Sequence, residues 1–363
     1  METTRLIDPA FWSSKKAAFP GADVPGWSAD APGLVWFRTS GSTGRPRWIG
    51  HSREGLLLSA AVVNRHLGVS ETDVWGLALP LRHVGGFGVV ARAFEAGARL
   101  EVFREPWDAR RLTAWLSEKE VRHLSLVPTQ VHDLVGAGLQ APPALRTVVV
   151  GGGALAEPAG RAARALGWPV LPSYGLTEAA SQVATAPPLL LDKPYIATPL
   201  PVLPHWELVC GDGGRIVIRG RALFIAEALE SASGFEFVER SGDWHETGDR
   251  GRLTSAGVEV LGRADLLVKV LGELVDPVEV ERRIGVANAV VVALPDPRRQ
   301  HRLVVVVEGT PAPEVAEAIE RHNAAVEGPE RVEGPVVVGK FPRGELGKLR
   351  RAELSRLIAM RMS

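Results

Sequence analysis

The chain has few of the features that accompany disulfide-bonded, membrane-bound or nucleic-acid-binding proteins. Its 363 residues include one cysteine, Cys210, which excludes intramolecular disulfides and cysteine-rich metal sites and suits a reducing compartment. Forty-two basic residues balance 42 acidic ones, so no global field would gather nucleic acid or hold the chain on an anionic membrane. No apolar run reaches the ~18 residues of a membrane-spanning helix, and the N-terminal stretch has no basic segment followed by an apolar core. We therefore expect a cytoplasmic protein without nucleic-acid partner or membrane insertion, which binds small neutral or anionic ligands.

Apolar runs rich in valine and leucine recur between residues 34 and 175, with helical segments between them. This alternation predicts an α/β domain with buried strands. Ser52 is placed to cap a helix over residues 55–68. After residue 186 the sequence becomes Pro-rich and strand-like, which favours a smaller β subdomain, and beyond residue 263 strands and helices mix again. Because the length exceeds one hydrophobic core, we predict an N-terminal domain over 1–262 and a C-terminal domain over 263–363.

A glycine- and hydroxyl-rich loop, TSGSTGRPR at 39–47, follows the first of these strands. The simplest interpretation is a hairpin turn. Hydroxyls and exposed amides around unencumbered backbone would also form an anion-binding concavity, to which Arg47 adds a cation. The P-loop pattern GxxxxGK[ST] is absent, so the loop alone leaves a plain turn and a phosphate site as alternatives. The residues that would surround a phosphate are Thr39, Ser40, Gly41, Ser42, Thr43 and Gly44.

Another glycine cluster, VVVGGGALAEPAG, matches GxGxxA after a strand, at Gly151, Gly153 and Ala156. Taken alone it would suggest a dinucleotide fold and a nicotinamide oxidoreductase. The next strand, over residues 168–175, does not end in the acidic residue that a ribose needs. We interpret the cluster as a tight strand-to-helix turn and keep the oxidoreductase as a minor alternative.

Five stretches in a fixed order carry a resemblance to a known family: TSGSTGRPR at 39–47, SYGLTE at 173–178, TGD at 247–249, GRADLLVKVLGELVDPVEVE at 262–281 and PRGELGK at 342–348. Together they resemble the adenylate-forming superfamily of acyl-CoA synthetases, luciferases and peptide-synthetase adenylation domains. The resemblance runs from about residue 34 to the end, and the part before it is shorter than in most members. It implies a large N-terminal α/β domain with a β subdomain that binds ATP and the acid, and a small mobile α+β C-terminal domain.

The resemblance also implies a reaction in two steps. A carboxylate and ATP form an acyl-adenylate and pyrophosphate with Mg²⁺ present, and the thiol of coenzyme A then displaces AMP. The glycine-rich loop would wrap the β- and γ-phosphates, and Glu178 would be the magnesium ligand. Lys348 would stabilise the charge that develops as the carboxylate attacks phosphorus. The remaining nucleotide contacts would come from Tyr174 and Gly175 at the adenine, Thr177 at the α-phosphate and Asp249 and Arg263 at the ribose, with Asp265 as the hinge between the two domains.

Each of these residues also has an ordinary structural interpretation, such as a buried tyrosine or a Thr-Glu pair that caps a helix. It is the set in this order that favours the enzyme. Two departures stand out: the first loop ends in Pro46-Arg47 where the family usually has Pro-Lys, and LGELVD replaces a stretch that often has two glycines before the glutamate. The guanidinium keeps the charge but is a different donor from an ammonium.

Two further stretches, LPLRHVGG at 79–86 and GLTEAASQVAT at 175–185, bear on the acid. The GLTEAASQVAT stretch particularly resembles the o-succinylbenzoyl-CoA synthetases of menaquinone biosynthesis. In acyl-CoA synthetases a histidine like His83 closes over the reacting carboxylate. The free aromatic carboxylate of o-succinylbenzoate would need donors or a cation, for which the candidates are Ser181, Gln182 and Arg82, and the resemblance also assigns Gly151 and Gly152 to the substrate.

Other functions stay open at this point. They are another acyl- or aryl-CoA ligase, an adenylating enzyme that loads a separate carrier protein, and a non-catalytic ATP-binding module. Retention of both Lys348 and Glu178 argues against the last of these. The sequence leaves the oligomeric state undetermined, with a homodimer as one option.

Overall fold

The computed structural model describes residues 3–22, 24, 27, 32–39, 47–231, 234–286, 288–344, 347 and 349–362. The chain divides into two compact units. The first comprises Met1–Gly211, Ile216–Thr247 and Arg252–Val260, and the second comprises Asp212–Arg215, Gly248–Gly251 and Leu261–Ser363. We describe each unit by itself.

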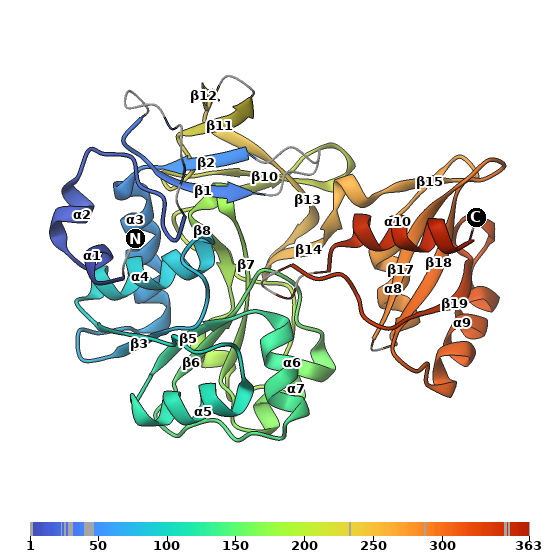
Figure 1. Cartoon of the computed structure of the whole chain (residues 1–363), viewed down its shortest axis with the longest axis horizontal. Helices are drawn as coiled ribbons and strands as arrows, with labels where there is room; N and C mark the ends of the chain where they lie inside the picture. Colours follow the sequence, from blue (N-terminus) through green and yellow to red (C-terminus); the bar gives the residue numbers. More distant parts are fainter. Residues whose placement is uncertain are drawn as a thin grey trace. The chain divides into compact units, whose positions relative to one another are not determined.

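A six-stranded sheet in the order β4-β3-β5-β6-β7-β8 forms the centre of the first unit (Figure 1). The first five strands are parallel, and β8 pairs antiparallel with β7. The carboxyl ends of the parallel strands meet at one edge, which is where ligands of open α/β sheets bind. The strands are β3 (Val74–Leu77), β4 (Arg99–Val102), β5 (His123–Leu126), β6 (Thr147–Val150), β7 (Val170–Leu176) and β8 (Ser181–Thr185).

Helices cover both faces of this sheet, which explains the continuous apolar runs of its strands. In β6, Val149 packs in the cluster that includes α3 (Arg53–Leu67) and α4 (Val84–Ala96), whereas Val148 and Val150 pack in the cluster on the other face. That other face is covered by α5 (Ala109–Glu118), α6 (Pro128–Gly136) and α7 (Glu157–Ala165). The predicted α/β class is confirmed.

The strand-rich region after residue 186 contributes to two four-stranded sheets, one of which also contains the two strands that flank the glycine-rich loop. One has the order β1-β2-β11-β12, with β1 (Val35–Thr39), β2 (Arg47–His51), β11 (Ala226–Ser231) and β12 (Gly234–Glu239). The other has the order β14-β13-β10-β9, with β9 (Glu207–Cys210), β10 (Arg215–Arg219), β13 (Trp244–Thr254) and β14 (Gly257–Arg263). Two short helices, α1 (Thr3–Leu6) and α2 (Pro9–Ser13), precede β1.

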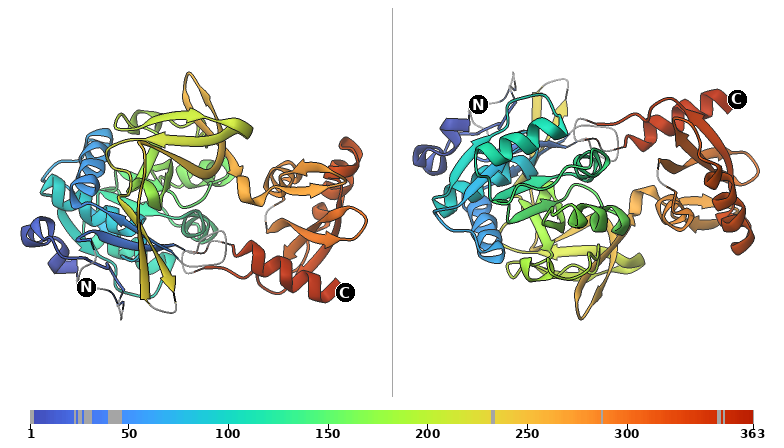
Figure 2. Two further views of the ribbon diagram at one scale, coloured as in Figure 1. Left: turned by 90° about the horizontal axis from the view of Figure 1, so that it is seen from above. Right: turned by 90° about the horizontal axis from the view of Figure 1, so that it is seen from below.

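The second unit is built on a three-stranded sheet, β17-β18-β19, with a small hairpin before it in sequence. Helices α8 and α9 pack with the cluster on one face of the sheet and α10 with the cluster on the other (Figure 2). The strands are β15 (Val268–Val270), β16 (Glu273–Val275), β17 (Ala289–Asp296), β18 (Gln300–Glu308) and β19 (Val332–Val338), and the helices are α8 (Pro277–Ile284), α9 (Pro313–Ala325) and α10 (Arg351–Met362).

Candidate active site

The glycine-rich loop joins the antiparallel strands β1 and β2. Thr39 ends β1 and pairs in register with Arg47, which begins β2, so the hairpin interpretation is confirmed. The Thr39 hydroxyl donates to the Arg47 carbonyl at 3.4 Å. The loop residues between them, Ser40, Gly41, Ser42, Thr43 and Gly44, lie outside the described residues.

Arg47 connects the base of this loop to the SYGLTE stretch. Its Nη2 donates to Oε1 of Glu178 at 2.6 Å, and its Nη1 donates to Oε1 of Glu227 on β11 at 3.0 Å. Glu178 is buried, and its backbone carbonyl accepts a hydrogen bond from the Phe224 amide at 2.9 Å. One guanidinium therefore holds two carboxylates through its two terminal nitrogens.

A tight reversal after β7 presents the predicted nucleotide residues. Gly175 lies so close to β8 that a Cβ there would be 1.6 Å from the Ser181 carbonyl, so no other residue fits. The chain then turns through a single 3-10 turn, Thr177–Ala179, and through Ala180 and Ser181, whose φ angles are 51° and 102°. Backbone conformations of this kind cost free energy and are typical of functional turns.

His51 at the end of β2 is a residue of this site that the motifs did not indicate. It is fully buried, and its Nε2 lies 2.7 Å from the Thr177 carbonyl. Burial lowers the pKa of His51 to about 4, so the ring is neutral near pH 7 and Nε2 carries the proton that it donates. The contact fixes the backbone of the Thr177 turn against the strand that follows the glycine-rich loop.

A narrow hollow lies behind the turn, and we call it the Arg92 hollow. The lining comes from α3, from α4 and from the turn into β8, and it comprises Leu56, Ser59, Ala60 and Val63, then Gly88, Ala91 and Arg92, and finally Ala180, Ser181 and Gln182. Ser181 and Gln182, which the sequence indicated for the acyl pocket, both line this hollow. Gln182 is buried, and its backbone carbonyl accepts a hydrogen bond from the Trp206 indole at 2.9 Å.

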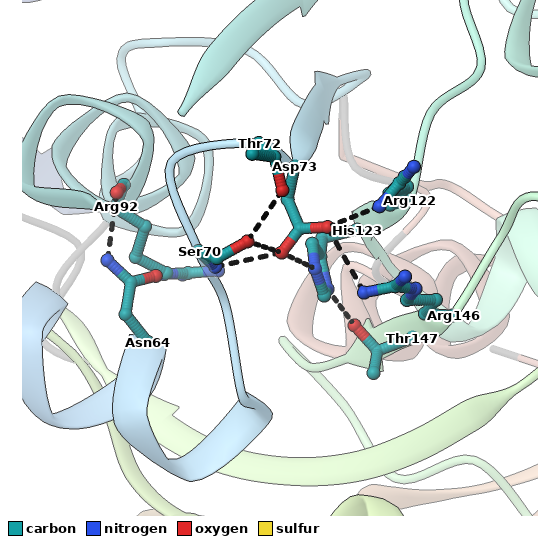
Figure 3. Close-up of polar contacts among 9 residues, drawn as sticks. All are labelled: Asn64, Ser70, Thr72, Asp73, Arg92, Arg122, His123, Arg146 and Thr147. Carbon is teal, nitrogen blue, oxygen red and sulfur yellow. Dashed lines mark hydrogen bonds and ion pairs between the residues drawn. The ribbon is translucent and has the colours of Figure 1, made fainter. Parts of the chain in front are cut away.

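Arg92 is another residue that the motifs did not indicate. The Nη1 atom donates to the Ser125 hydroxyl at 3.2 Å, and the guanidinium carbon lies 5.0 Å from the centre of the Trp75 ring. The Arg92 backbone carbonyl accepts a hydrogen bond from Asn64 at 2.9 Å (Figure 3). Burial lowers the pKa of Arg92 to about 9, which leaves it charged near pH 7. Among the residues that the structure describes, no carboxylate forms an ion pair with this cation.

The residues that the sequence indicated for the acyl carboxylate lie just before α4. His83 is the N-cap residue of this helix, and Arg82 is exposed beside it. Burial, and then the Arg82 charge, lower the pKa of His83 below its ordinary value. Gly151 and Gly152 follow β6 in the predicted strand-to-helix turn, where Gly152 has a φ of 75° that favours glycine. None of these four residues lines the Arg92 hollow.

Three further predicted residues lie together in the second unit. Arg263 lies 3.6 Å from Asp249, and it donates to both carboxylate oxygens of Asp265 at 3.0 Å. The proposed ribose contacts and the proposed hinge are thus neighbours. Lys348 lies outside the described residues. No group of three or more His, Cys, Asp or Glu side chains suited to a metal ion occurs in the part of the chain that the structure describes.

No helix among the described residues is both long and apolar enough to cross a membrane.

Comparisons with known proteins agree on one family. The family model described as AMP-binding enzyme matches residues 7–225. A 2-succinylbenzoate–CoA ligase of Listeria monocytogenes is 28% identical over 328 residues, which cover 87% of this chain and 68% of the relative. The o-succinylbenzoate CoA synthetase of Bacillus subtilis, solved with its acyl-adenylate intermediate, has a TM-score of 0.75 at 25% identity, over 90% of this chain and 69% of that one. The same enzyme solved with ATP and a magnesium ion has a TM-score of 0.73 at 25% identity, over 90% and 70%.

Proposed function

Because this chain belongs to the AMP-binding enzyme family, we propose that it is an AMP-forming acid–thiol ligase. It converts o-succinylbenzoate, ATP and coenzyme A to o-succinylbenzoyl-CoA, AMP and pyrophosphate in menaquinone biosynthesis. The ligase relatives named for this acid and the B. subtilis complexes support the substrate and the nucleotide. Domain roles follow: residues 1–262 bind ATP and the acid, and residues 263–363 form the mobile lid.

The ATP site is assigned from the family motifs and from the contacts around Arg47. The glycine-rich loop lies at the end of β1 and β2, so Arg47 and the loop hydroxyls can meet a triphosphate beside the Thr177 turn. His51 keeps this turn in place through the Thr177 carbonyl. The residues proposed for the nucleotide are Thr39, Ser40, Gly41, Ser42, Thr43, Gly44 and Arg47 at the phosphates, Tyr174 and Gly175 at the adenine, Thr177 at the α-phosphate, and Asp249 and Arg263 at the ribose.

A magnesium ion fits beside Glu178. Mg²⁺ is usually bound by one or two carboxylates together with substrate phosphates, so one buried glutamate next to a phosphate loop is a sufficient protein ligand. Bound there, the ion would neutralise charge on the phosphates. Arg47 holds the same carboxylate in its present rotamer, which keeps Glu178 aimed at the base of the loop.

Lys348 and His83 are proposed to act on the reacting carboxylate. The Lys348 ammonium stabilises the negative charge that develops between the carboxylate oxygen and the α-phosphorus. A neutral His83, favoured by its lowered pKa, closes over the acyl group without adding another cation. In the second step the coenzyme A thiol attacks the acyl carbon and AMP leaves, after the lid has turned about Asp265.

The observation that carries the choice of acid is the Arg92 hollow. A fully buried charge without a partner is rare, because its desolvation cost is large. An anionic oxygen at the hollow would supply the missing partner. We therefore replace Arg82 by Arg92 as the cation for the free aromatic carboxylate, with Ser181 and Gln182 beside it and Gly151 and Gly152 at the succinyl chain.

The last two parts of the proposal are the cellular location and the oligomeric state. The single cysteine supports a cytoplasmic location, where thiols stay reduced. Size-exclusion chromatography with light scattering would decide whether the chain is a monomer or a homodimer.

The test is pyrophosphate release with magnesium-ATP across a panel of carboxylic acids that includes o-succinylbenzoate, each with and without coenzyme A. The proposal predicts release with o-succinylbenzoate. Release only with another acid would keep the ligase and discard this substrate. ATP binding without release from any acid would favour a non-catalytic protein.

A further inference from the structure

Residues 9–22, which we call the N-terminal segment, are tied to the start of α3 by one buried arginine. Arg53 is the first residue of α3 and is 8% exposed. All three nitrogens of its guanidinium donate to backbone carbonyls, to that of Phe11 at 2.7 Å and to those of Lys16 and Gly33 at 2.8 Å each. Because the N–H groups of arginine diverge in one plane, a single side chain holds three separate points of the chain.

The N-terminal segment is also joined to the strand β1. A Cβ on Gly33 would lie 1.8 Å from the Lys15 carbonyl, so only glycine lets the two parts of the chain approach this closely. The Ala18 amide donates to the Leu34 carbonyl at 2.9 Å, and the Ala18 carbonyl accepts from the Trp36 amide at 2.8 Å. The segment therefore has a fixed place relative to both β1 and α3.

Aromatic side chains of the N-terminal segment pack on α4 (Figure 1). The Trp12 ring stacks on that of Phe94, with 5.2 Å between the ring centres, and its centre lies 5.7 Å from that of Phe87. Phe87 and Phe94 are seven residues apart and thus share one face of the helix. The segment holds, in this way, the helix whose N-cap residue is His83.

The end of the N-terminal segment contacts the loop before α4 as well. Residues 19–22 form a turn, in which the amide of the last residue donates to the carbonyl of the first at 3.3 Å. Pro20 and Gly21 take the central positions, and Gly21 has a φ of 66°, which is the pattern of a type II turn. A Cβ on Gly21 would lie 3.1 Å from the Arg82 amide nitrogen, so the turn is in close contact with the residue before His83.

We propose that Arg53 is a positioning residue for the reaction, because it holds the N-terminal segment against the loop and the helix that carry His83. Gly21 is the point at which the segment contacts this loop. A displacement of about 1 Å in a group that faces the reacting atoms can cost about 100-fold in rate. The inference rests on the proposed function, in which His83 closes over the acyl group.

Gly21→Ala tests the contact with the loop. The added methyl group would press on the Arg82 backbone. Gly138→Ala is the matched control, because Gly138 has a φ of 62° and alanine there carries the same left-handed strain. No atom of the described residues lies within 4 Å of a Cβ on Gly138, so this strain is its only effect.

We would measure KM for o-succinylbenzoate and for magnesium-ATP in these proteins. Gly21→Ala is expected to raise KM for the acid about five- to tenfold and to leave KM for ATP within about twofold, while Gly138→Ala changes neither. Loss of folded protein alone would lower kcat and leave both KM values. An equal rise in the two KM values, or an unchanged KM for the acid, would overturn the proposal.

Arg53→Lys tests the attachment of the segment. A lysine keeps the charge but has no fork of donors for three carbonyls, so the segment should loosen. We expect faster backbone hydrogen exchange over residues 9–22 and 79–87, read by mass spectrometry, and a rise in KM for the acid as in Gly21→Ala. Arg65→Lys, at an exposed position of the same helix, is the control and should change neither.

The two measurements separate the possible failures. Unchanged exchange over residues 79–87 in Arg53→Lys would reject the role of Arg53, whatever the activity. Absence of activity with o-succinylbenzoate in the unmodified protein would reject the proposed function, and with it the part that Arg53 has in that reaction.

Discussion

Arg47 binds two carboxylates at once, Glu178 and Glu227, in the place where a triphosphate is proposed to bind. Its side chain is about one-third exposed, and the glutamates are less exposed than that. Without this cation, two negative side chains would face the phosphates and repel them. Arg47 is therefore needed to neutralise the two glutamates before ATP binds, and to contact the phosphates afterwards.

We predict that Arg47→Met raises KM for magnesium-ATP about tenfold, which corresponds to about 1.4 kcal/mol, and that Arg47→Lys recovers most of the loss because it restores the charge. Arg38→Met is the matched control. Arg38 forms an ion pair with Glu230 in the same sheet, at 3.2 Å, but both side chains are more exposed. Equal KM values in the Arg47→Met and unmodified proteins would refute the role of the guanidinium.

His205 should make the first unit sensitive to acid. Both of its ring nitrogens are buried without a hydrogen-bond partner among the described residues, and burial lowers its pKa to about 4. As the pH falls from about 6.5 to 4, the unfolded chain takes up this proton before the folded chain does, so stability is lost over that range. The full loss is about 2 kcal/mol, allowing for the part of the ring that water reaches.

Urea unfolding at pH 7 and pH 4.5 would measure this effect. We expect His205→Gln to lose about 1.4 kcal/mol less than the unmodified protein between these two values, since part of the full effect appears only below pH 4.5. The remaining histidines are the same in both proteins and cancel in the comparison. An equal loss of unfolding free energy in the variant and the unmodified protein would show that His205 does not titrate in this way.

At the scale of elements, a buried carboxylate joins the amino ends of three parallel strands, at the edge away from the carboxyl ends that carry the site. Asp73, just before β3, accepts from the Ser70 amide and hydroxyl at 2.8 and 3.0 Å and from Arg122 and Arg146 at 3.1 and 3.2 Å (Figure 3). His123, the first residue of β5, lies 3.5 Å from it. Burial alone would raise the pKa of Asp73, but the Ser70 hydrogen bonds, His123 and Arg122 bring it below its ordinary value.

Removal of this carboxylate should be costly. We predict that Asp73→Ala lowers the free energy of unfolding by about 3 kcal/mol, because it removes the buried acceptor that Ser70, Arg122 and Arg146 share and leaves the buried His123 ring without its carboxylate neighbour. The exposed i,i+4 pair Glu157–Arg161 on α7 is the reference, and Glu157→Ala should cost less than about 0.5 kcal/mol. Chemical denaturation of both variants would measure these free energies of unfolding. Similar small losses in the two variants would show that the hydrogen bonds of Asp73 contribute little to stability.

The elements that could be predicted from sequence are those that depend on local patterns. Ser52 caps α3 as expected, with its hydroxyl accepting from the Gly55 amide at 3.0 Å. The apolar runs after residue 73 are strands of the six-stranded sheet, whereas the first run, before the glycine-rich loop, is β1 of another sheet. Such features need only neighbouring residues. The turn from Gly151 to α7 likewise follows from the glycines themselves.

The site was less predictable, because it depends on contacts between distant segments. Arg82 was one of three candidates for the free carboxylate because it lies in the LPLRHVGG stretch, and Arg92, which lines the hollow, was not among them. A signal was present: Arg92 is the single cation among the otherwise apolar residues of VGGFGVVARAF, which a solvent-facing residue would not explain. His51 gave no such signal, since its partner Thr177 is 126 residues away and a buried histidine in a strand is ordinary.

At the scale of the whole molecule, the proposed lysine and the proposed phosphate loop come from different units of one chain. Because the two groups lie in different units, a substitution of the lysine should lower the rate of adenylate formation without weakening ATP binding. Lys348→Ala should keep ATP affinity within about threefold but lower pyrophosphate release with o-succinylbenzoate by about 100- to 1,000-fold. ATP binding by calorimetry and single-turnover release of pyrophosphate would test this. Lys340→Ala, a change eight residues earlier in the same unit, should leave both unchanged.

The most direct test of the proposed reaction is product identity. We would incubate the full chain with o-succinylbenzoate, magnesium-ATP and coenzyme A, and follow the thioester by mass spectrometry together with AMP. We expect o-succinylbenzoyl-CoA in equal amount to AMP, and no thioester when ATP is left out. AMP with no thioester, or a thioester with a different acid and none with this one, would contradict the proposed reaction.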